Sequence, residues 1–174
     1  MAASRLGNQL REIASTLQST GASFALIGGL ALAPHKVVRA TQDIDLLMDA
    51  TMADAVHDAL LSLGYQCLHR SADAGNYLRH DERVDFIYAH RPAALRLLRN
   101  AKPLKTDFGL LHVVSAEGLI GLKLQGYVND PRRTRDLEDI RSLIAANRDA
   151  LDFNEVKGYF RLFGQDSLLK ELLG

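Results

Sequence analysis

Two aspartates, Asp43 and Asp45, interrupt the apolar strand pattern that ends at Met48. Side chains two residues apart in a strand emerge on the same face, so both carboxylates share one face while Ile44 and Leu46 point to the other. Like charges held this close repel each other unless a cation lies between them. The pattern therefore favours a divalent-metal site. The alternative is the solvated face of an edge strand.

A Gly-Gly pair, Gly28 and Gly29, follows a short apolar strand predicted at residues 23–27. Glycines allow backbone N–H groups to approach a ligand closely. The next residues, 30–32, have helical character, and the N-terminus of a helix favours phosphate. The sequence therefore predicts a phosphate-binding turn next to the aspartate pair.

A further acid, Asp85, stands inside an apolar strand predicted at residues 83–88. The hairpin-like spacing would bring it alongside the earlier aspartates. Three carboxylates on adjacent strands suit two-metal phosphoryl transfer, in which cations roughly 4 Å apart hold the attacking and leaving oxygens. The alternative is that Asp85 pairs with Arg83 or Arg79.

These pieces together resemble the signature of the polymerase-beta-like nucleotidyltransferase superfamily, and most of all its AbiEii-type members. The matching segments are Gly28-Gly29, Arg39-Ala40-Thr41 and Asp43-Ile44-Asp45-Leu46. Many members of the superfamily carry Gly-Ser in the turn, so Gly29 is a departure that removes a hydroxyl from the phosphate site.

The resemblance implies roles for these residues. Asp43, Asp45 and Asp85 would be catalytic and would hold Mg²⁺ or Mn²⁺. The nucleoside triphosphate would be bound by the turn, by Arg39 and by Thr41. No Ser-His or Cys-His pair is needed, because such catalysis is mostly positioning and charge neutralisation.

Lys123 lies four residues after Leu119 and four before Tyr127, so it shares the apolar stripe of a predicted helix. Its ammonium group either reaches water while the stem covers the core, or points at the triphosphate. The second interpretation is preferred, because Leu-x-x-Leu-Lys resembles the lysine motif of the AbiEii-like enzymes. In either case methionine at this position is expected to preserve the fold.

The segment from Arg132 to Ile140 resembles the second helical motif of the same enzymes, a basic residue followed by Asp-Leu-x-Asp-Ile. The match favours Asp136 as a catalytic acid that either orients Lys123 or accepts a proton from the attacking hydroxyl. For Asp139 the preferred interpretation is pairing with a neighbouring arginine of the segment 132–135.

Periodicity and capping residues predict the remaining elements. They are helices at residues 4–19, 52–63 with Thr51 as cap, 115–128 and 132–147; a helix opened by Pro92; strands at 65–69 and 76–79; one or two edge strands within 101–114; and two short helices after Asp152.

The 174 residues suffice for a single domain, with a core at 1–114 and a helical part at 115–174. We expect an α/β (α+β) nucleotidyltransferase fold, in which helices flank a small mixed twisted sheet and the C-terminal helices close the cleft. A net charge of zero argues against a general polyanion binder. The apolar runs are too short to span a membrane, so a soluble cytoplasmic protein is expected. Cys67 is given no role.

The resulting hypothesis is a magnesium-dependent transfer of a nucleotidyl group from a nucleoside triphosphate to a hydroxyl acceptor. By resemblance this would be a toxin-like enzyme that modifies tRNA, another RNA or a protein, with a cognate antitoxin as partner. An antibiotic-modifying nucleotidyltransferase is the nearest alternative. A non-catalytic nucleotide-binding or antitoxin-like partner protein is the alternative from another class, and the complete set of acids argues against it.

Overall fold

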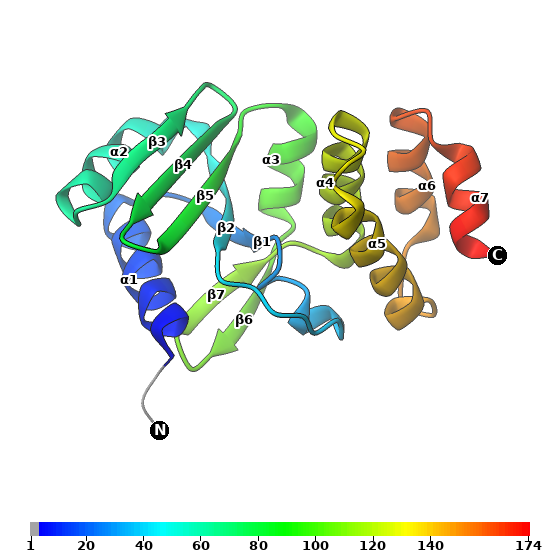
Figure 1. Cartoon of the computed structure of the whole chain (residues 1–174), viewed down its shortest axis with the longest axis horizontal. Coiled ribbons are helices and arrows are strands. Elements are labelled where there is room, and N and C mark those ends of the chain that lie inside the picture. Colours follow the sequence, from blue (N-terminus) through cyan, green and yellow to red (C-terminus); the bar gives the residue numbers. More distant parts are fainter. Residues whose placement is uncertain (1–3) are drawn as a thin grey trace. The chain divides into compact units, whose positions relative to one another are not determined.

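A computed structural model describes residues 4–174. It contains two compact units (Figure 1). The first unit comprises the chain up to Ala31 together with Ala40–Val114, and the second comprises Leu32–Arg39 and Ser115–Gly174.

The first unit is built on a mixed sheet with the strand order β3-β4-β5-β2-β1-β7-β6. The strands are β1 (Phe24–Ile27), β2 (Ile44–Asp49), β3 (Gln66–Arg70), β4 (Ala74–Arg79), β5 (Glu82–Ala89), β6 (Lys102–Thr106) and β7 (Gly109–Val113). β2 runs antiparallel to β1 and parallel to β5, and β7 runs parallel to β1. The predicted edge strands are therefore only half correct, because β7 lies between β1 and β6.

β2 lies at the centre of the sheet, between β5 and β1, and one of its faces is wholly apolar. Ile44, Leu46 and Met48 have no exposed surface. On the other face, Asp45 is half-buried at the beginning of the strand. A shift of one residue in register would bury this carboxylate in the core, so the alternation holds β2 in place.

Three α-helices belong to the first unit: α1 (Arg5–Thr20), α2 (Ala53–Ser62) and α3 (Pro92–Arg99). Ser4 caps α1 by accepting a hydrogen bond from the backbone N–H of Gly7, and Pro92 opens α3 as predicted. α1 packs against α2, and α3 packs against β2 and β5.

Two local predictions are wrong. No α-helix begins at residues 30–32, where the chain forms turns followed by the three-residue 3₁₀ helix η1 (Ala33–His35). Thr51 does not cap α2, because it lies inside a second 3₁₀ helix, η2 (Ala50–Met52), and its hydroxyl donates to Asp49 Oδ1. Within the described residues, no α-helix N-terminus directly follows this turn that could favour phosphate binding.

The second unit consists of four α-helices and η1. The helices are α4 (Ala116–Asn129), α5 (Thr134–Asn147), α6 (Phe153–Leu162) and α7 (Asp166–Leu173). α4 packs against α5 and α6, and α6 packs against α7. Ser115 and Asp152 cap α4 and α6 as predicted. Leu124, Ile140 and Phe160 form part of the core and are fully buried.

None of the helices within residues 4–174 has the length and apolar character that a membrane crossing requires.

Candidate active site

Asp45 and Asp85 are direct partners on the parallel strands β2 and β5. Paired residues share a face of the sheet, and adjacent strands lie about 4.8 Å apart. Asp43 precedes β2 by one residue and is exposed. The sheet thus brings Asp85 beside Asp45 as expected, although through parallel pairing of β2 and β5 and not through a hairpin.

Gly28 lies directly against Asp45. A Cβ atom built on Gly28 would meet Asp45 Oδ2 at 2.1 Å, and the backbone at Gly28 has a φ of 65°. Both the backbone conformation and the closeness of the carboxylate require glycine here. The turn and the acid are therefore packed against each other.

Gly29 is held equally closely by Thr41. A Cβ atom on Gly29 would meet both Cβ and Oγ1 of Thr41 at 2.8 Å. The Thr41 hydroxyl lies 3.4 Å from the backbone oxygen of Asp43. Thr41 therefore links the glycine turn to the segment that carries the aspartates.

Asp85 accepts hydrogen bonds from two side chains. Asn76, its partner on β4, donates to Oδ1 at 2.7 Å. Arg83 Nε lies 2.9 Å from Oδ2 and 3.1 Å from Oδ1. The pairing of Asp85 with Arg83, which the sequence left open as an alternative, is thus present in the structure.

Arg83 also interacts with the other two acids. Its hydrogen bond to Asp85 raises the pKa of the guanidinium above its ordinary value. The negative charges of Asp43 and Asp45 raise this pKa further. Within the described part of the chain, no three His, Cys, Asp or Glu side chains are arranged to hold a metal ion. Arg83 therefore supplies a positive charge among these carboxylates.

Lys123 in the second unit is buried, with a side chain only 7% exposed. Its Nζ lies 2.7 Å from Asp139 Oδ2 and 3.5 Å from Asp136 Oδ1. Lys123 therefore does not reach water by snorkelling, but forms a buried ion pair.

The two aspartates each have a second cation. Arg39 Nε lies 3.0 Å from Asp139 Oδ1, and Arg39 also donates to Oδ2 through Nη2 at 3.0 Å. Arg133 Nε lies 2.6 Å from Asp136 Oδ2. Charges of alternating sign thus run from Arg39 to Arg133 through Asp139, Lys123 and Asp136. We call the three buried residues Asp139, Lys123 and Asp136 the buried charge network; the exposed Arg133 and the partly exposed Arg39 are its outer partners.

The predicted site residues fall into these two groups. The first unit holds Gly28, Gly29, Thr41, Asp43, Asp45 and Asp85, and the second holds Arg39, Lys123 and Asp136. Asp139 was predicted to pair with an arginine of the segment 132–135, whereas its partners are Lys123 and Arg39.

Sequence reasoning missed Asn76 and the importance of Arg83. A two-residue turn at His80 and Asp81 would have revealed Asn76, because counting back from that turn places it opposite Asp85. The burial of Asp139 also had a signal. Asp136, Asp139, Ile140 and Leu143 follow helical spacing on one face of α5.

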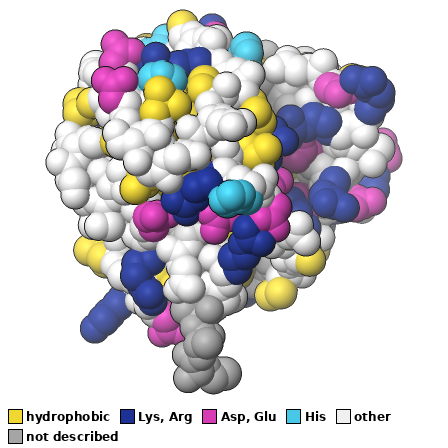
Figure 2. Space-filling model, turned by 60° about the vertical axis from the view of Figure 1, so that its left-hand side comes forward, with side chains coloured by type: hydrophobic (Ala, Val, Ile, Leu, Met, Phe, Trp, Pro, Cys, Tyr) yellow, Lys and Arg dark blue, Asp and Glu magenta, His cyan; other side chains and the backbone are white. Residues whose placement is uncertain are grey.

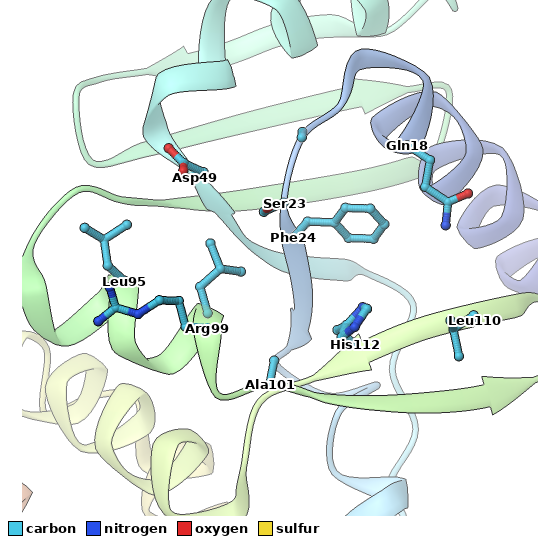
Figure 3. Close-up of a pocket in the computed structure, with 11 residues that line it drawn as sticks. Gln18, Ser23, Phe24, Asp49, Leu95, Arg99, Ala101, Leu110 and His112 are labelled. Carbon is cyan, nitrogen blue, oxygen red and sulfur yellow. The ribbon is translucent and has the colours of Figure 1, made fainter.

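A hollow of about 600 Å³ lies elsewhere in the first unit. It is formed at the end of β1 and β2 that is opposite to Asp45, next to α3 (Figure 3). Phe24, Asp49, Arg99 and His112 are among the residues that line it, and none of the predicted site residues is. The hollow is therefore separate from Asp43, Asp45 and Asp85.

Acidic and basic side chains are interspersed on the face shown in Figure 2, where magenta groups lie among dark blue ones. This mixture agrees with the net charge of zero.

The profile of a family described as "uncharacterised nucleotidyltransferase" matches residues 1–165. The chain therefore belongs to this nucleotidyltransferase family. A search of curated proteins gave no significant match. The family match does not distinguish AbiEii-type members from other nucleotidyltransferases, so the AbiEii-type resemblance stays a prediction.

Solved structures show the same fold at low sequence identity. The solution structure of the antibiotic-resistance factor ANT(2'')-Ia is 16% identical, with a TM-score of 0.68 over 95% of this chain and 94% of that chain. Its crystal structure with adenylyl-2''-tobramycin has 16% identity and a TM-score of 0.66 over 92% and 97%. The lincomycin-bound lincosamide adenylyltransferase LnuA has 17% identity and a TM-score of 0.59 over 80% and 96%. The predicted α/β nucleotidyltransferase fold is confirmed.

The contact between Gly28 and Asp45 gives a first prediction. Gly28→Ala adds a Cβ atom to a left-handed residue and forces the Asp45 carboxylate to move. The control Gly21→Ala has a similar φ of 76° but meets nothing within 4 Å. We expect both variants to lose roughly 1 kcal/mol of stability from backbone strain, and Gly28→Ala to lose more. Thermal unfolding measures the difference, and equal losses would show that the contact is unimportant.

The buried charge network gives a second prediction and changes the expectation for Lys123→Met. Methionine suits the apolar stripe, but it leaves two buried carboxylates with one cation fewer. We expect a loss of about 3 kcal/mol, since removing one partner of a buried ion pair is strongly destabilising.

Urea unfolding measures this loss, with the exposed Lys157→Met in the same unit as control. The double variant Lys123→Met/Asp139→Asn should recover part of it. Wild-type stability of Lys123→Met would contradict the importance of the network.

Proposed function

We propose that the chain is a metal-dependent nucleotidyltransferase that moves a nucleotidyl group from a nucleoside triphosphate to a hydroxyl acceptor. The observation that carries the proposal is the packing of the glycine turn against Asp45, next to the paired Asp85. Membership of a nucleotidyltransferase family supports the same reaction class.

The types of the donors at this site, rather than their present arrangement, suit a magnesium or manganese ion. Carboxylate oxygens are the ligands that such hard cations prefer, and Asp43, Asp45 and Asp85 supply them. When bound, the metal would neutralise charge on the phosphates. The three acids already attract one positive charge, the guanidinium of Arg83. This attraction supports the binding of a metal cation at the same position.

The reaction needs positioning more than covalent catalysis. The acceptor hydroxyl oxygen attacks the α-phosphorus, the bond to the β-phosphate oxygen breaks, and pyrophosphate leaves. Backbone N–H groups of the turn at Gly28 and Gly29 would bind phosphate oxygens. The hydroxyl proton needs an acceptor, for which a carboxylate is suitable.

Lys123 in the second unit is held in place by two carboxylates. The distance of 3.5 Å from Asp136 Oδ1 to Lys123 Nζ supports the orienting role of Asp136 over its role as proton acceptor. Asp139 makes the shorter contact and would share this role. Contact of Lys123 or Arg39 with the triphosphate stays a prediction.

Two acceptor classes follow from different observations. The AbiEii-type motifs favour a hydroxyl of RNA, tRNA included, and with it a toxin-like role and a cognate antitoxin. The similarity to ANT(2'')-Ia over nearly the full length of both chains favours a hydroxyl of a small molecule such as an antibiotic.

A transfer assay tests the function. We expect radiolabel from an α-labelled nucleoside triphosphate to appear on RNA or on an aminoglycoside or lincosamide when the protein and Mg²⁺ are present. Asp45→Asn should lower the rate at least about a hundredfold, because the metal contributes several kcal/mol to such reactions.

Asp49→Asn is the matched control for this assay. Asp49 lies on the same strand but caps η2, and asparagine caps equally well. Full transfer activity of Asp45→Asn would overturn the catalytic assignment, and the acceptor that is labelled decides between the two classes.

Nucleotide binding is expected to depend on metal. The carboxylates repel a polyphosphate until a cation neutralises them. In calorimetric titrations we expect affinity for ATP, GTP, CTP or UTP to fall at least about tenfold when excess chelator replaces Mg²⁺. Equal affinity in chelator would argue against a metal site.

A further inference from the structure

Asp85 is held by two side chains of different character. Asn76 is neutral and half-buried, and it donates to Oδ1 from the neighbouring strand at 2.7 Å. Arg83 is charged, and it donates to both oxygens from the same strand. Among the residues that the structure describes, only Arg83 donates a hydrogen bond to Oδ2 of Asp85.

Arg83 is a cation that can leave. Its side chain is 45% exposed, against 21% for that of Asp85, and the attraction of a partly exposed ion pair is weakened because water and salt screen it. Its backbone, in contrast, is anchored, since the buried Gln9 donates from Nε2 to the Arg83 carbonyl oxygen at 3.2 Å. The guanidinium can therefore move while the strand stays in place.

A divalent cation that binds Asp85 must compete with this guanidinium. Asn76 carries no charge and donates only to Oδ1, so it leaves Oδ2 to the cation. Once displaced, the guanidinium would remain near the carboxylates on a long side chain. A planar guanidinium is suited to bind phosphate oxygens through paired hydrogen bonds.

We propose that Arg83 exchanges partners during nucleotide binding. In the metal-free protein it neutralises Asp85, and when metal and nucleotide bind it transfers its hydrogen bonds to the polyphosphate. Asn76 is the positioning residue that keeps Asp85 oriented throughout. This inference rests on the proposed function, because it presumes that metal and a nucleoside triphosphate bind at this site.

In this exchange, Arg83 opposes the binding of the metal ion and favours the binding of the nucleotide. In Arg83→Gln we expect Mn²⁺ alone to bind about threefold more tightly, because a weak competing ion pair is gone. We expect ATP, in saturating Mn²⁺, to bind about tenfold more weakly, because charged hydrogen bonds to phosphate are lost. Electron paramagnetic resonance measures free Mn²⁺, and calorimetry measures ATP binding.

Three further variants complete the test. Arg70→Gln removes the same charge from an ion pair between β3 and Asp54 of α2, and should change neither affinity. Arg83→Lys keeps the charge and should bind Mn²⁺ like the wild type. Asn76→Ala should bind both ligands more weakly, since Asp85 loses its fixed orientation.

Two outcomes are distinguishable failures. If the wild type binds both ligands but Arg83→Gln changes both affinities in the same direction, or neither, the exchange is wrong and the proposed function stands. If the wild type binds neither Mn²⁺ nor ATP, the proposed function fails and the exchange fails with it.

Discussion

Repulsion between carboxylates on adjacent strands is the constraint that the sheet of the first unit has to offset. Asp45 and Asp85 are partners on adjacent strands, and Asp43 is two residues away on the chain. A fold that only needed stability would not place like charges so close together. The apolar inner face of β2 supplies the stability that offsets this cost, since Ile44, Leu46 and Met48 are completely buried.

The two units neutralise their acids in different ways. In the first unit Arg83 supplies a counter-charge, and its side chain is 45% exposed. In the second unit Lys123 is buried between Asp136 and Asp139, each of which has an arginine as well. Because buried ion pairs are costly to break, we expect the buried charge network to stay in place. The pair of Arg83 and Asp85 is more exposed, and we expect it to rearrange more easily. This contrast agrees with the proposed function, in which the sheet accepts a charged ligand.

Most elements of the fold were predictable because they depend on local patterns. The alternation in β2, the cap at Ser115 and the proline at the start of α3 act over a few residues. The errors arose where a competing local structure won, as at Thr51, whose hydroxyl bonds to Asp49 inside a 3₁₀ turn. The failed helix at residues 30–32 has a related cause, since Pro34 lacks the backbone N–H that a helix interior needs.

The sequence by itself was enough to predict candidate site residues: the paired aspartates, the third acid in an apolar strand and the glycine turn. It also determined the family, because the nucleotidyltransferase profile matches residues 1–165. Only the tertiary structure decided how the charges are paired. Arg39 and Asp139 are 100 residues apart in the chain, and Lys123 reaches Asp139 from another helix. Such partners are chosen by burial and by the packing of distant elements, which no local spacing encodes.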